Sequence, residues 1–342
     1  MEPPLPGPLR RSSCPGSRPP LVLMQPLFLP STRRAFGLAL LLAAVHLGGC
    51  GPDSDAPRTD PGEAVTPSAA STPDDAGEAG TPDGWTPRTV TDHAGRSWTL
   101  QHPPRRILSL VPSATLLLLE LGEEGRLVGR TDYDTDPRLT SLPSVGGGLG
   151  PSLEVMLSLR PDLVLRFGGP TDPETPRRLD QAGIPHLALR PDHLDDVYRI
   201  TTLLGEVTGQ EEAAQGLVAR LRGELAAVAR AVDGADRPRV GILLGGDPPW
   251  VAGSETFIHD VVTLAGGDNV FADDGPLYAP ISVEEVLHRR PDVLLMTEGA
   301  RVPEALRRIP VLRAPSTLQS PGPELGAAAW AVARLLHPDR VP

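Results

Sequence analysis

The sequence predicts an α/β fold of two lobes with parallel-rich sheets, joined by a long helical segment. Short apolar strands alternate with helices before residue 190 and again after residue 236, a pattern typical of βαβ units. Between these stretches a helical period runs from about 194 to 232. The sequence SLEVMLSLRPD at 152–162 is also echoed by SVEEVLHRRPD at 282–292. An internal repeat on either side of a helical segment indicates two similar lobes.

The first lobe is expected over residues 85–190. A small hairpin over 89–99 precedes the first apolar strand, and the segment 112–115 then leads into a helix that ends before Gly122. Ser113 or Thr115 is expected to cap this helix, because a side-chain hydroxyl can accept from the free amides of a first turn. The strands are expected at 106–111, 127–131, 163–167 and 186–189, and further helices at 152–159 and 177–182.

A connecting helical spine is expected over 191–235, as two successive helices interrupted around Gly205–Gln210. The second helix, from Glu211, carries apolar residues at helical spacing but lacks heptads long enough for a coiled coil. The second lobe, 236–342, restarts the βα pattern, with loops expected after its first strand and through Pro280. Its strands are expected at 239–244, 293–297 and 311–312, and its helices at 257–265, 283–289, 302–307 and 325–336.

Residues 1–49 predict an export signal, with a true start at Met24 as an alternative. Arg33 and Arg34 precede an apolar run from 35 to 45, which is too short to span a bilayer, since about 20 residues are needed. Small residues then lead to Cys50, and together these features define a secretory signal. The stretch around Cys50 resembles a bacterial lipoprotein lipobox, which implies lipidation of that cysteine. The paired arginines also resemble, weakly, a twin-arginine export signal.

Residues 50–84 read as a lipidated cysteine followed by a disordered tether. From 51 to 84 there are eight acidic residues and one arginine, among many Pro, Thr, Gly and Ala residues. Such a segment buries too little apolar surface to offset the entropy of ordering it. The whole chain carries a formal net charge of −11, which argues against nucleic-acid binding. All 32 basic residues are arginine and the only other cysteine is Cys14, so the mature part offers no lysine or cysteine nucleophile and no Cys-ligated metal.

From about residue 89 to 338 the chain resembles the ABC-transporter substrate-binding proteins with a helical backbone, which carry vitamin B12, haem and ferric siderophores. The stretches that carry the resemblance are RILSLVPSAT at 106–115, VGRTDY at 128–133, PSLE at 151–154 and RPDLV at 160–164. The family implies two Rossmann-like lobes joined by a rigid helix, with the ligand held between them. Loops at the carboxyl ends of the strands are expected to line the cleft. The expected partners are ABC permease and ATPase subunits, and the protein is expected to be a monomer.

Glu154 and Glu284 are the residues that the family implies for docking to the permease. Two exposed carboxylates, one on each lobe, can make charge-assisted contacts with guanidinium groups, which fix register and speed encounter. The alternative is that each Glu only complements the dipole of the helix that it begins.

The ligand site is expected to be formed by eight residues from strand-to-helix loops and cleft-edge loops. A large, flat, partly apolar ligand favours aromatic surfaces, and aromatic residues make up only 4% of this chain. For each aromatic residue the alternative is core packing. The expected ligand-binding residues are Pro112, Ser113, Ala114, Thr115, Tyr133, Phe167, Trp250 and Tyr278.

The resemblance favours a corrinoid as the transported ligand, with haem or a ferric siderophore as the alternative, and implies no cofactor. Relatives that bind vitamin B12 usually carry Trp where this chain has Gly148. Haem and siderophore binders often use Arg or Tyr near a Pro-Gly-Pro stretch, which here is SPGPE at 320–324. Two other classes stay open, an extracytoplasmic enzyme and a structural lipoprotein. The sequence offers no Gly-x-Ser-x-Gly elbow, and its scattered histidines predict neither a catalytic residue nor a metal site. The expected location is the periplasm or cell surface.

Overall fold

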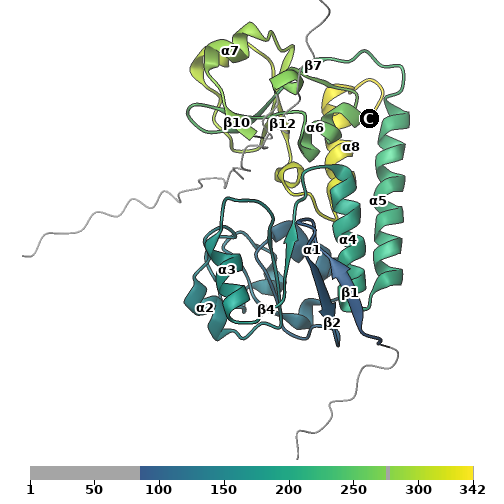
Figure 1. Ribbon diagram of the computed structural model, residues 1–342. Coiled ribbons are helices and arrows are strands. Elements are labelled where there is room, and N and C mark those ends of the chain that lie inside the picture. The colour runs from purple at the N-terminus through teal and green to yellow at the C-terminus, as the bar shows by residue number, and fades with distance from the viewer. Residues whose placement is uncertain (1–84, 275–277, 342) are drawn as a thin grey trace, which may run out of the picture. The chain divides into compact units, whose positions relative to one another are not determined.

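The computed structural model describes residues 85–274 and 278–341 (Figure 1). The N-terminal half begins with an antiparallel hairpin, β1 (Arg88–Thr91) and β2 (Ser97–Leu100). A four-stranded sheet follows in the order β4-β3-β5-β6, and every pair in it is parallel. Its strands are β3 (Ile107–Ser109), β4 (Leu127–Gly129), β5 (Leu163–Phe167) and β6 (His186–Leu189). The helices of this half are α1 (Pro112–Glu120), α2 (Leu153–Ser158) and α3 (Glu174–Gln181).

Two antiparallel helices then form the helical spine, α4 (Leu194–Thr208) and α5 (Glu211–Ala231). The prediction of two helices is confirmed, but the break is shorter than expected, because α4 continues through Gly205 and ends at Gly209. Gly209 has a φ of 80°, a left-handed conformation that glycine adopts without steric cost. A Cβ at Gly205 would lie 2.4 Å from Cβ of Ala214. The two helices therefore pack so closely that only glycine fits at that crossing.

The C-terminal half contains a six-stranded mixed sheet in the order β10-β8-β7-β11-β12, with β9 also paired to β7. β7, β9, β11 and β12 are parallel to one another. At one edge, β8 pairs antiparallel with β7 and with the outermost strand, β10. The strands are β7 (Arg239–Gly245), β8 (Trp250–Ala252), β9 (Asp268–Asn269), β10 (Tyr278–Pro280), β11 (Val293–Thr297) and β12 (Val311–Ala314). The helices are α6 (Phe257–Leu264), α7 (Val283–His288) and α8 (Leu325–Leu336).

Three details of this half and of α1 differ from the sequence-based expectation. β8 and β10 lie where loops were expected, because strands of three residues are too short to show an alternating pattern. The expected helix over 302–307 is only a 3-10 turn, Glu304–Leu306, closed off by Pro310, which cannot continue a helix. The N-cap of α1 is Val111, without a side-chain bond, so neither Ser113 nor Thr115 caps that helix.

The largest apolar cluster joins the two halves through the spine. It takes side chains from α1, α4, α5, α6 and α8, among them Leu117, Leu204, Leu221, Val261 and Ala329. Two smaller clusters lie elsewhere. One includes Met156 of α2 together with Leu108 and Val164, and the other includes Val286 of α7 together with Leu243 and Leu294. α2 and α7 therefore each rest on a small core of their own, beside the sheet of their own half.

The repeated motif forms the same corner in both halves, built around α2 and α7. Ser152 and Ser282 are the N-caps, and each hydroxyl accepts from the amide three residues ahead, which satisfies one of the free amides of the first turn. Each helix ends at a non-glycine residue with positive φ, Arg160 at 46° and Arg290 at 51°. Such a conformation is uncommon for arginine, so its occurrence at both matching positions shows that the repeat extends to the backbone.

An arginine at the start of a sheet strand braces each corner, Arg106 immediately before β3 and Arg239 as the first residue of β7. Arg106 donates to the carbonyls of Leu159 and Arg160 at 2.7 and 3.0 Å, and Arg239 does the same for Arg289 and Arg290. The last carbonyls of a helix have no partner within it, and a guanidinium near that end also complements the helix dipole. Because the arginine holds the last carbonyls of each short helix, it fixes the direction of the helix axis, and with it the orientation of the first turn.

Candidate functional site

Glu154 and Glu284 occupy equivalent, exposed positions in the first turns of α2 and α7. Neither carboxylate makes a hydrogen bond or ion pair within the described part of the chain. The helix dipole favours a negative charge there, which is consistent with the alternative reading of these residues. The repeat nevertheless places one such carboxylate on each of two corners that are capped and braced in the same way. The role of these glutamates in docking stays a prediction.

The segment 112–115 is the first turn of α1 rather than a loop. Pro112 occupies N1, where its missing N–H costs nothing. The side chains of Ser113, Ala114 and Thr115 are buried, which corrects the expectation of an open loop. Only the free backbone amides of this turn remain suited to meeting a ligand.

Tyr133 lies half-buried in the turn that follows β4. The carboxylate of Asp134 accepts from the amide and hydroxyl of Thr131 at 2.7 and 2.8 Å, and the hydroxyl of Thr115 also bonds to it. Burial raises the pKa of Asp134, although these hydrogen bonds oppose the shift. Asp134 therefore ties the turn that carries Tyr133 to the first turn of α1, which brings two of the predicted site segments together.

Phe167 ends β5 and is half-buried, with Gly148 packed against its ring. A Cβ on Gly148 would lie 3.2 Å from Cε2 of Phe167 and only 2.3 Å from the carbonyl oxygen of Leu110. The second distance involves rigid backbone, so no side chain fits at this position. The close approach of the Leu110 carbonyl therefore excludes an aromatic side chain at position 148.

Trp250 and Tyr278 lie together on the antiparallel edge strands β8 and β10. Tyr278 is opposite Ala252, and Pro280 is opposite Trp250, so the two aromatic residues are diagonal neighbours on one face. Both are half-buried. Tyr278 precedes Glu284 by six residues, as Gly148 precedes Glu154. Tyr278 in the C-terminal half thus occupies the position of the repeat at which the N-terminal half has Gly148, which has no side chain.

The carboxylates of Asp192 and Asp260 act electrostatically on the phenol of Tyr278. Burial raises the pKa of its phenol, and the negative charges of Asp192 and Asp260 raise it further. Asp260 of α6 also accepts from Nδ1 of His193 and from the amide of Leu194, each at 3.1 Å. Glu255 lies 3.7 Å from the other ring nitrogen of His193. This cluster joins the start of α4 to the first turns of α6, and sequence reasoning missed it because its members lie more than 60 residues apart.

A second polar cluster lies in the N-terminal half around His186, whose side chain is 0% exposed. Nε of Arg166 donates to its Nδ1 at 3.0 Å, and Asp180 lies 3.2 Å from its Nε2. Burial lowers the pKa of His186, and the charge of Arg166 lowers it further. The histidine is therefore neutral at pH 7. No nucleophile accompanies it in these contacts.

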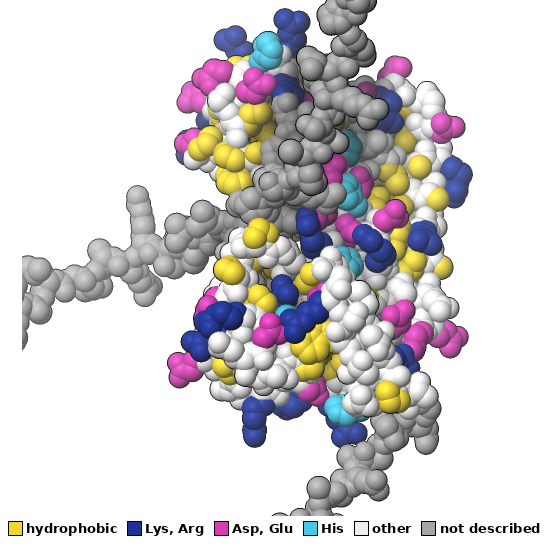
Figure 2. All heavy atoms as spheres, viewed as in Figure 1, with side chains coloured by type: hydrophobic (Ala, Val, Ile, Leu, Met, Phe, Trp, Pro, Cys, Tyr) yellow, Lys and Arg dark blue, Asp and Glu magenta, His cyan; other side chains and the backbone are white. Residues whose placement is uncertain are grey.

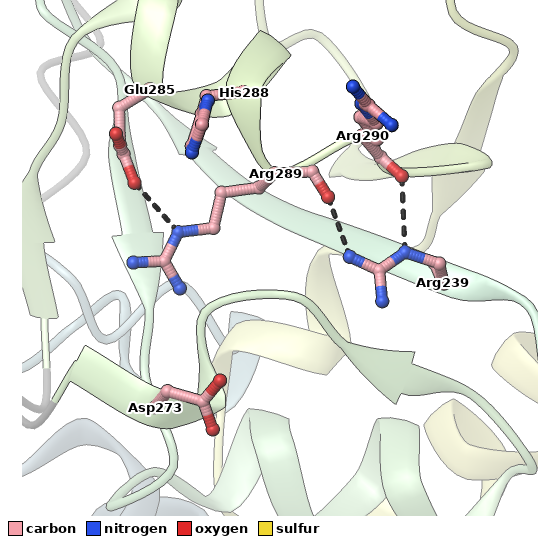
Figure 3. Close-up of a pocket in the computed structure, with 6 residues that line it drawn as sticks. All are labelled: Arg239, Asp273, Glu285, His288, Arg289 and Arg290. Carbon is pink, nitrogen blue, oxygen red and sulfur yellow. Dashed lines mark hydrogen bonds and ion pairs between the residues drawn. The ribbon is translucent and has the colours of Figure 1, made fainter.

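A hollow of about 780 Å³ lies at the far end of α7 (Figure 3). Three of its six lining residues are arginines, Arg239, Arg289 and Arg290, and the side chains of the first two are already engaged. Arg239 braces the carbonyls of the corner, and Arg289 donates to Glu285 at 2.9 Å and to the carbonyl of Val270. The matching N-terminal residues, Val155 and Leu159, pack on an apolar cluster. The hollow thus lies where the corner around α7 is held by polar contacts, whereas the corner around α2 is held at the same place by apolar packing.

Within residues 85–274 and 278–341, no group of three or more His, Cys, Asp or Glu side chains is placed to hold a metal ion. No helix in that part is long and apolar enough to cross a bilayer. On the face seen in Figure 2, arginine and acidic side chains are intermixed rather than gathered by sign. Cys50 and the tether lie outside the described residues, so their predicted roles are not tested by the structure.

Comparison with known proteins places these features in a family. A family model described as periplasmic binding protein matches residues 107–319. The uncharacterized ABC transporter substrate-binding lipoprotein YvrC of Bacillus subtilis (strain 168) is 26% identical over 283 residues, or 81% of this chain and 84% of that protein. A cobalamin-binding protein of Halobacterium salinarum is 35% identical over 222 residues, or 61% of this chain and 58% of that protein.

Among solved structures, the periplasmic heme-binding protein RhuT from Roseiflexus sp. RS-1 in apo form matches with a TM-score of 0.61 and 29% identity. The match covers 70% of this chain and 99% of that one. The predicted α/β fold of two lobes is thereby confirmed, while the ligands named for these two relatives, cobalamin and heme, differ. Because the family model covers more than half of the sequence, the chain belongs to the periplasmic binding protein family, whose members bind substrates for transport and are not enzymes.

Proposed function

We propose that this protein is the lipid-anchored, extracytoplasmic binding protein of an ABC importer, which captures a corrinoid and delivers it to a permease. The observation that carries the delivery role is the pair of matched corners. Each presents an exposed glutamate without a partner within the described chain, on a helix whose two ends are capped and braced. Carboxylates held in this way are suited to guanidinium groups of a permease. Lipidation of Cys50 would anchor the protein at the membrane. The anchored protein acts as a monomer.

The half-buried aromatic residues support a large, partly apolar ligand. Trp250 and Tyr278 share one face of the edge strand pair β8–β10, and Phe167 lies against the bare backbone of Gly148. Burial raises the pKa of the Tyr278 phenol, and the negative charges of Asp192 and Asp260 add to that shift. Negative charge at this wall disfavours an anionic ligand group, which favours a corrinoid over haem with its propionates. Similarity to the cobalamin-binding protein of Halobacterium salinarum points the same way.

Haem or a ferric siderophore is the second candidate, and the similarity to RhuT favours it. A small hollow beside Pro323 is lined by Arg138 and Arg220, which are residues that an anionic ligand would need. Both arginines are already paired, Arg138 with Asp136 at 2.8 Å and Arg220 with Glu120 at 2.5 Å. Little unpaired positive charge is therefore left in this hollow to bind the propionates of haem.

The mechanism is capture without chemical change of the ligand. Aromatic side chains and the first-turn amides of α1 desolvate and orient the ligand. The spine of α4 and α5 is held to both halves by one apolar cluster, which limits how far the halves can move. The corners then present Glu154 and Glu284 to the permease, and ATP hydrolysis by the partner subunits drives import.

Calorimetric titration of the full chain with cyanocobalamin, haemin and ferrioxamine, each separately, tests the ligand. We expect cyanocobalamin to bind tightly, and Tyr278→Ala to weaken binding about tenfold or more, since one aromatic contact contributes on the order of 1 kcal/mol or more. Tyr198→Phe on α4 is the matched control, because this aromatic residue packs in the spine core under Arg222 and should leave the affinity unchanged.

Three outcomes separate the candidates. Binding of cyanocobalamin that depends on Tyr278 supports the corrinoid and its site together. Binding of haemin or ferrioxamine alone keeps the transport role and replaces the ligand. If none of the three binds, the aromatic residues lose their assigned role, and the corrinoid proposal is wrong.

A further inference from the structure

Each docking helix carries a leucine that the core does not use. Leu157 of α2 and Leu287 of α7 occupy the same position of the repeat, one turn after the docking glutamate. Leu287 is 44% exposed and is the one large hydrophobic residue exposed within the described part of the chain. Leu157 is half-exposed. Neither belongs to an apolar cluster or to the residues packed against one, although their neighbours Met156 and Val286 are fully buried.

The helix places each leucine beside its glutamate. Residues three apart lie on the same face of a helix, about 5–6 Å apart between Cβ atoms, so Glu154 adjoins Leu157 and Glu284 adjoins Leu287. A single exposed leucine needs no explanation. Two leucines at equivalent positions of an internal repeat, both outside the core and both next to an unpaired carboxylate, are a repeated surface feature.

The residues around the two leucines differ, which makes the shared pair more informative. Val155 and Ser158 in α2 correspond to Glu285 and His288 in α7. The two helices therefore changed their other side-facing residues to suit different surroundings, yet the glutamate and the leucine are the same. A requirement of packing would not explain this, since the surroundings are apolar in one half and polar in the other.

We propose that the docking surface on each lobe is a Glu–Leu pair, Glu154 with Leu157 and Glu284 with Leu287, and that the partner is a permease surface that sets an arginine beside an apolar pocket. This inference rests on the proposed delivery role. Charge complementarity of the glutamates selects the partner and speeds its approach. The leucines are desolvated on contact, and burial of an apolar anchor beside a charged pair is the arrangement that slows dissociation.

The test uses the full chain and the purified permease–ATPase complex of the same organism in lipid nanodiscs, followed by surface plasmon resonance. We expect Leu157→Ser and Leu287→Ser each to weaken binding about tenfold, and together about a hundredfold, through faster dissociation. Glu154→Gln and Glu284→Gln should instead slow association and reduce its salt dependence. Leucine variants that keep the salt dependence of the wild type distinguish an apolar contact from an electrostatic one.

Controls exclude loss of folding. Ala219→Ser, also on an exposed helix face but on α5, should behave as wild type. Leu157→Met and Leu287→Met keep an apolar side chain and should retain binding. Because both leucines lie outside the core, their serine variants should keep the wild-type melting temperature and the wild-type affinity for cyanocobalamin.

Other results would overturn the inference in distinct ways. If the glutamine variants weaken docking while the serine variants match Ala219→Ser, the leucines have no part in the interface and the delivery role stands. If the serine variants change the oligomeric state in gel filtration but not docking, the leucines serve self-association. If the wild type does not bind the complex at all, the delivery role and the Glu–Leu surface are both wrong.

Discussion

The corner around α2 and the corner around α7 are built alike at their ends and differently along their sides. Both have a serine N-cap, an arginine with positive φ and a bracing arginine at the start of a sheet strand. Along the sides, Val155 and Leu159 are replaced by Glu285 and Arg289, and the preceding segment carries Gly148 in one half and Tyr278 in the other. Contacts that orient the helix start are shared, whereas the preceding segment and the contacts to the local core differ.

This difference separates two demands on the same motif. Orientation of the glutamate at the start of each helix depends on caps and braces, which act on backbone groups and tolerate little change. Packing against a neighbour depends on what that neighbour is, and each half satisfies it in its own way. Variants that exchange or remove one of these contacts test the comparison directly.

The largest effect is expected at Gly148. Alanine there would place Cβ 2.3 Å from a backbone oxygen, so the backbone must shift, and we expect a loss of about 2–4 kcal/mol of unfolding free energy. Urea unfolding measures it. Gly216→Ala on α5 is the control, because nothing lies near its Cβ, and it should gain about 0.5–1 kcal/mol. An equal effect of both substitutions would mean that the close approach to Leu110 does not constrain the chain.

The two aspartates that follow the corners should differ by their number of amide partners. Asp162 accepts from the amides of Arg105 and Arg106 at 2.8 and 2.9 Å, whereas Asp292 accepts from that of Arg239 alone. Residue 238 is proline and has no N–H to donate. We expect Asp162→Ala to cost about 2 kcal/mol and Asp292→Ala about 1 kcal/mol in urea unfolding, since these bonds are at the surface. Equal costs would contradict this account of the asymmetry.

Conversion of the second corner toward the first should cost about 1 kcal/mol. The double variant Glu285→Val, Arg289→Leu removes their ion pair and leaves the carbonyl of Val270 without the donor that Arg289 supplies at 2.9 Å. Loss of one buried partner has about this effect. The same urea measurement applies, with Arg301→Leu, an exposed arginine of the same half, as control. A gain in stability would show that the polar brace is not required.

Two histidines should give opposite pH dependence. Burial lowers the pKa of His186 from 6.5, aided by Arg166, so the unfolded chain binds the proton more readily and stability falls as pH drops below about 6.5. Burial also acts to lower the pKa of His193, but the bond to Asp260 and the charges of Asp260, Asp196 and Glu255 raise it above 6.5. Its contribution is present below about pH 6.5 and is lost as pH rises through the raised value.

Thermal melting from pH 5 to 8 with His186→Gln and His193→Gln separates the two histidines. The first variant should flatten the acidic fall in melting temperature, and the second should steepen it. If both variants shift the curve in one direction, the two environments do not differ as described. We expect the effect of His193→Gln to be the smallest, since His193 and its partners are partly exposed and screened by solvent.

Much of the fold followed from local patterns. Alternation of short apolar strands and helices predicted the two sheets, and the helical period predicted α4 and α5. The motif SxE, with RPD beginning eight residues after the serine, predicted that Glu154 and Glu284 occupy equivalent places. These predictions succeeded because caps, periodicity and turn residues act between residues close in sequence.

The misses share one cause. β8 and β10 exist only through pairing with each other and with β7, and Ser113 and Thr115 are buried by other elements rather than free to cap. No local signal marks Arg106 and Arg239 as braces, or Asp260 as the partner of His193. Each depends on a contact between distant parts of the chain.

The sequence by itself determined the α/β alternation, the helical spine and the repeated glutamates, because short-range hydrogen bonding and side-chain period encode them. Only the tertiary structure decided that Gly148 admits no side chain, that Trp250 and Tyr278 share one face, and that Leu157 and Leu287 stay outside the core. Those facts depend on which atoms meet in space, and close packing of distant segments fixes them.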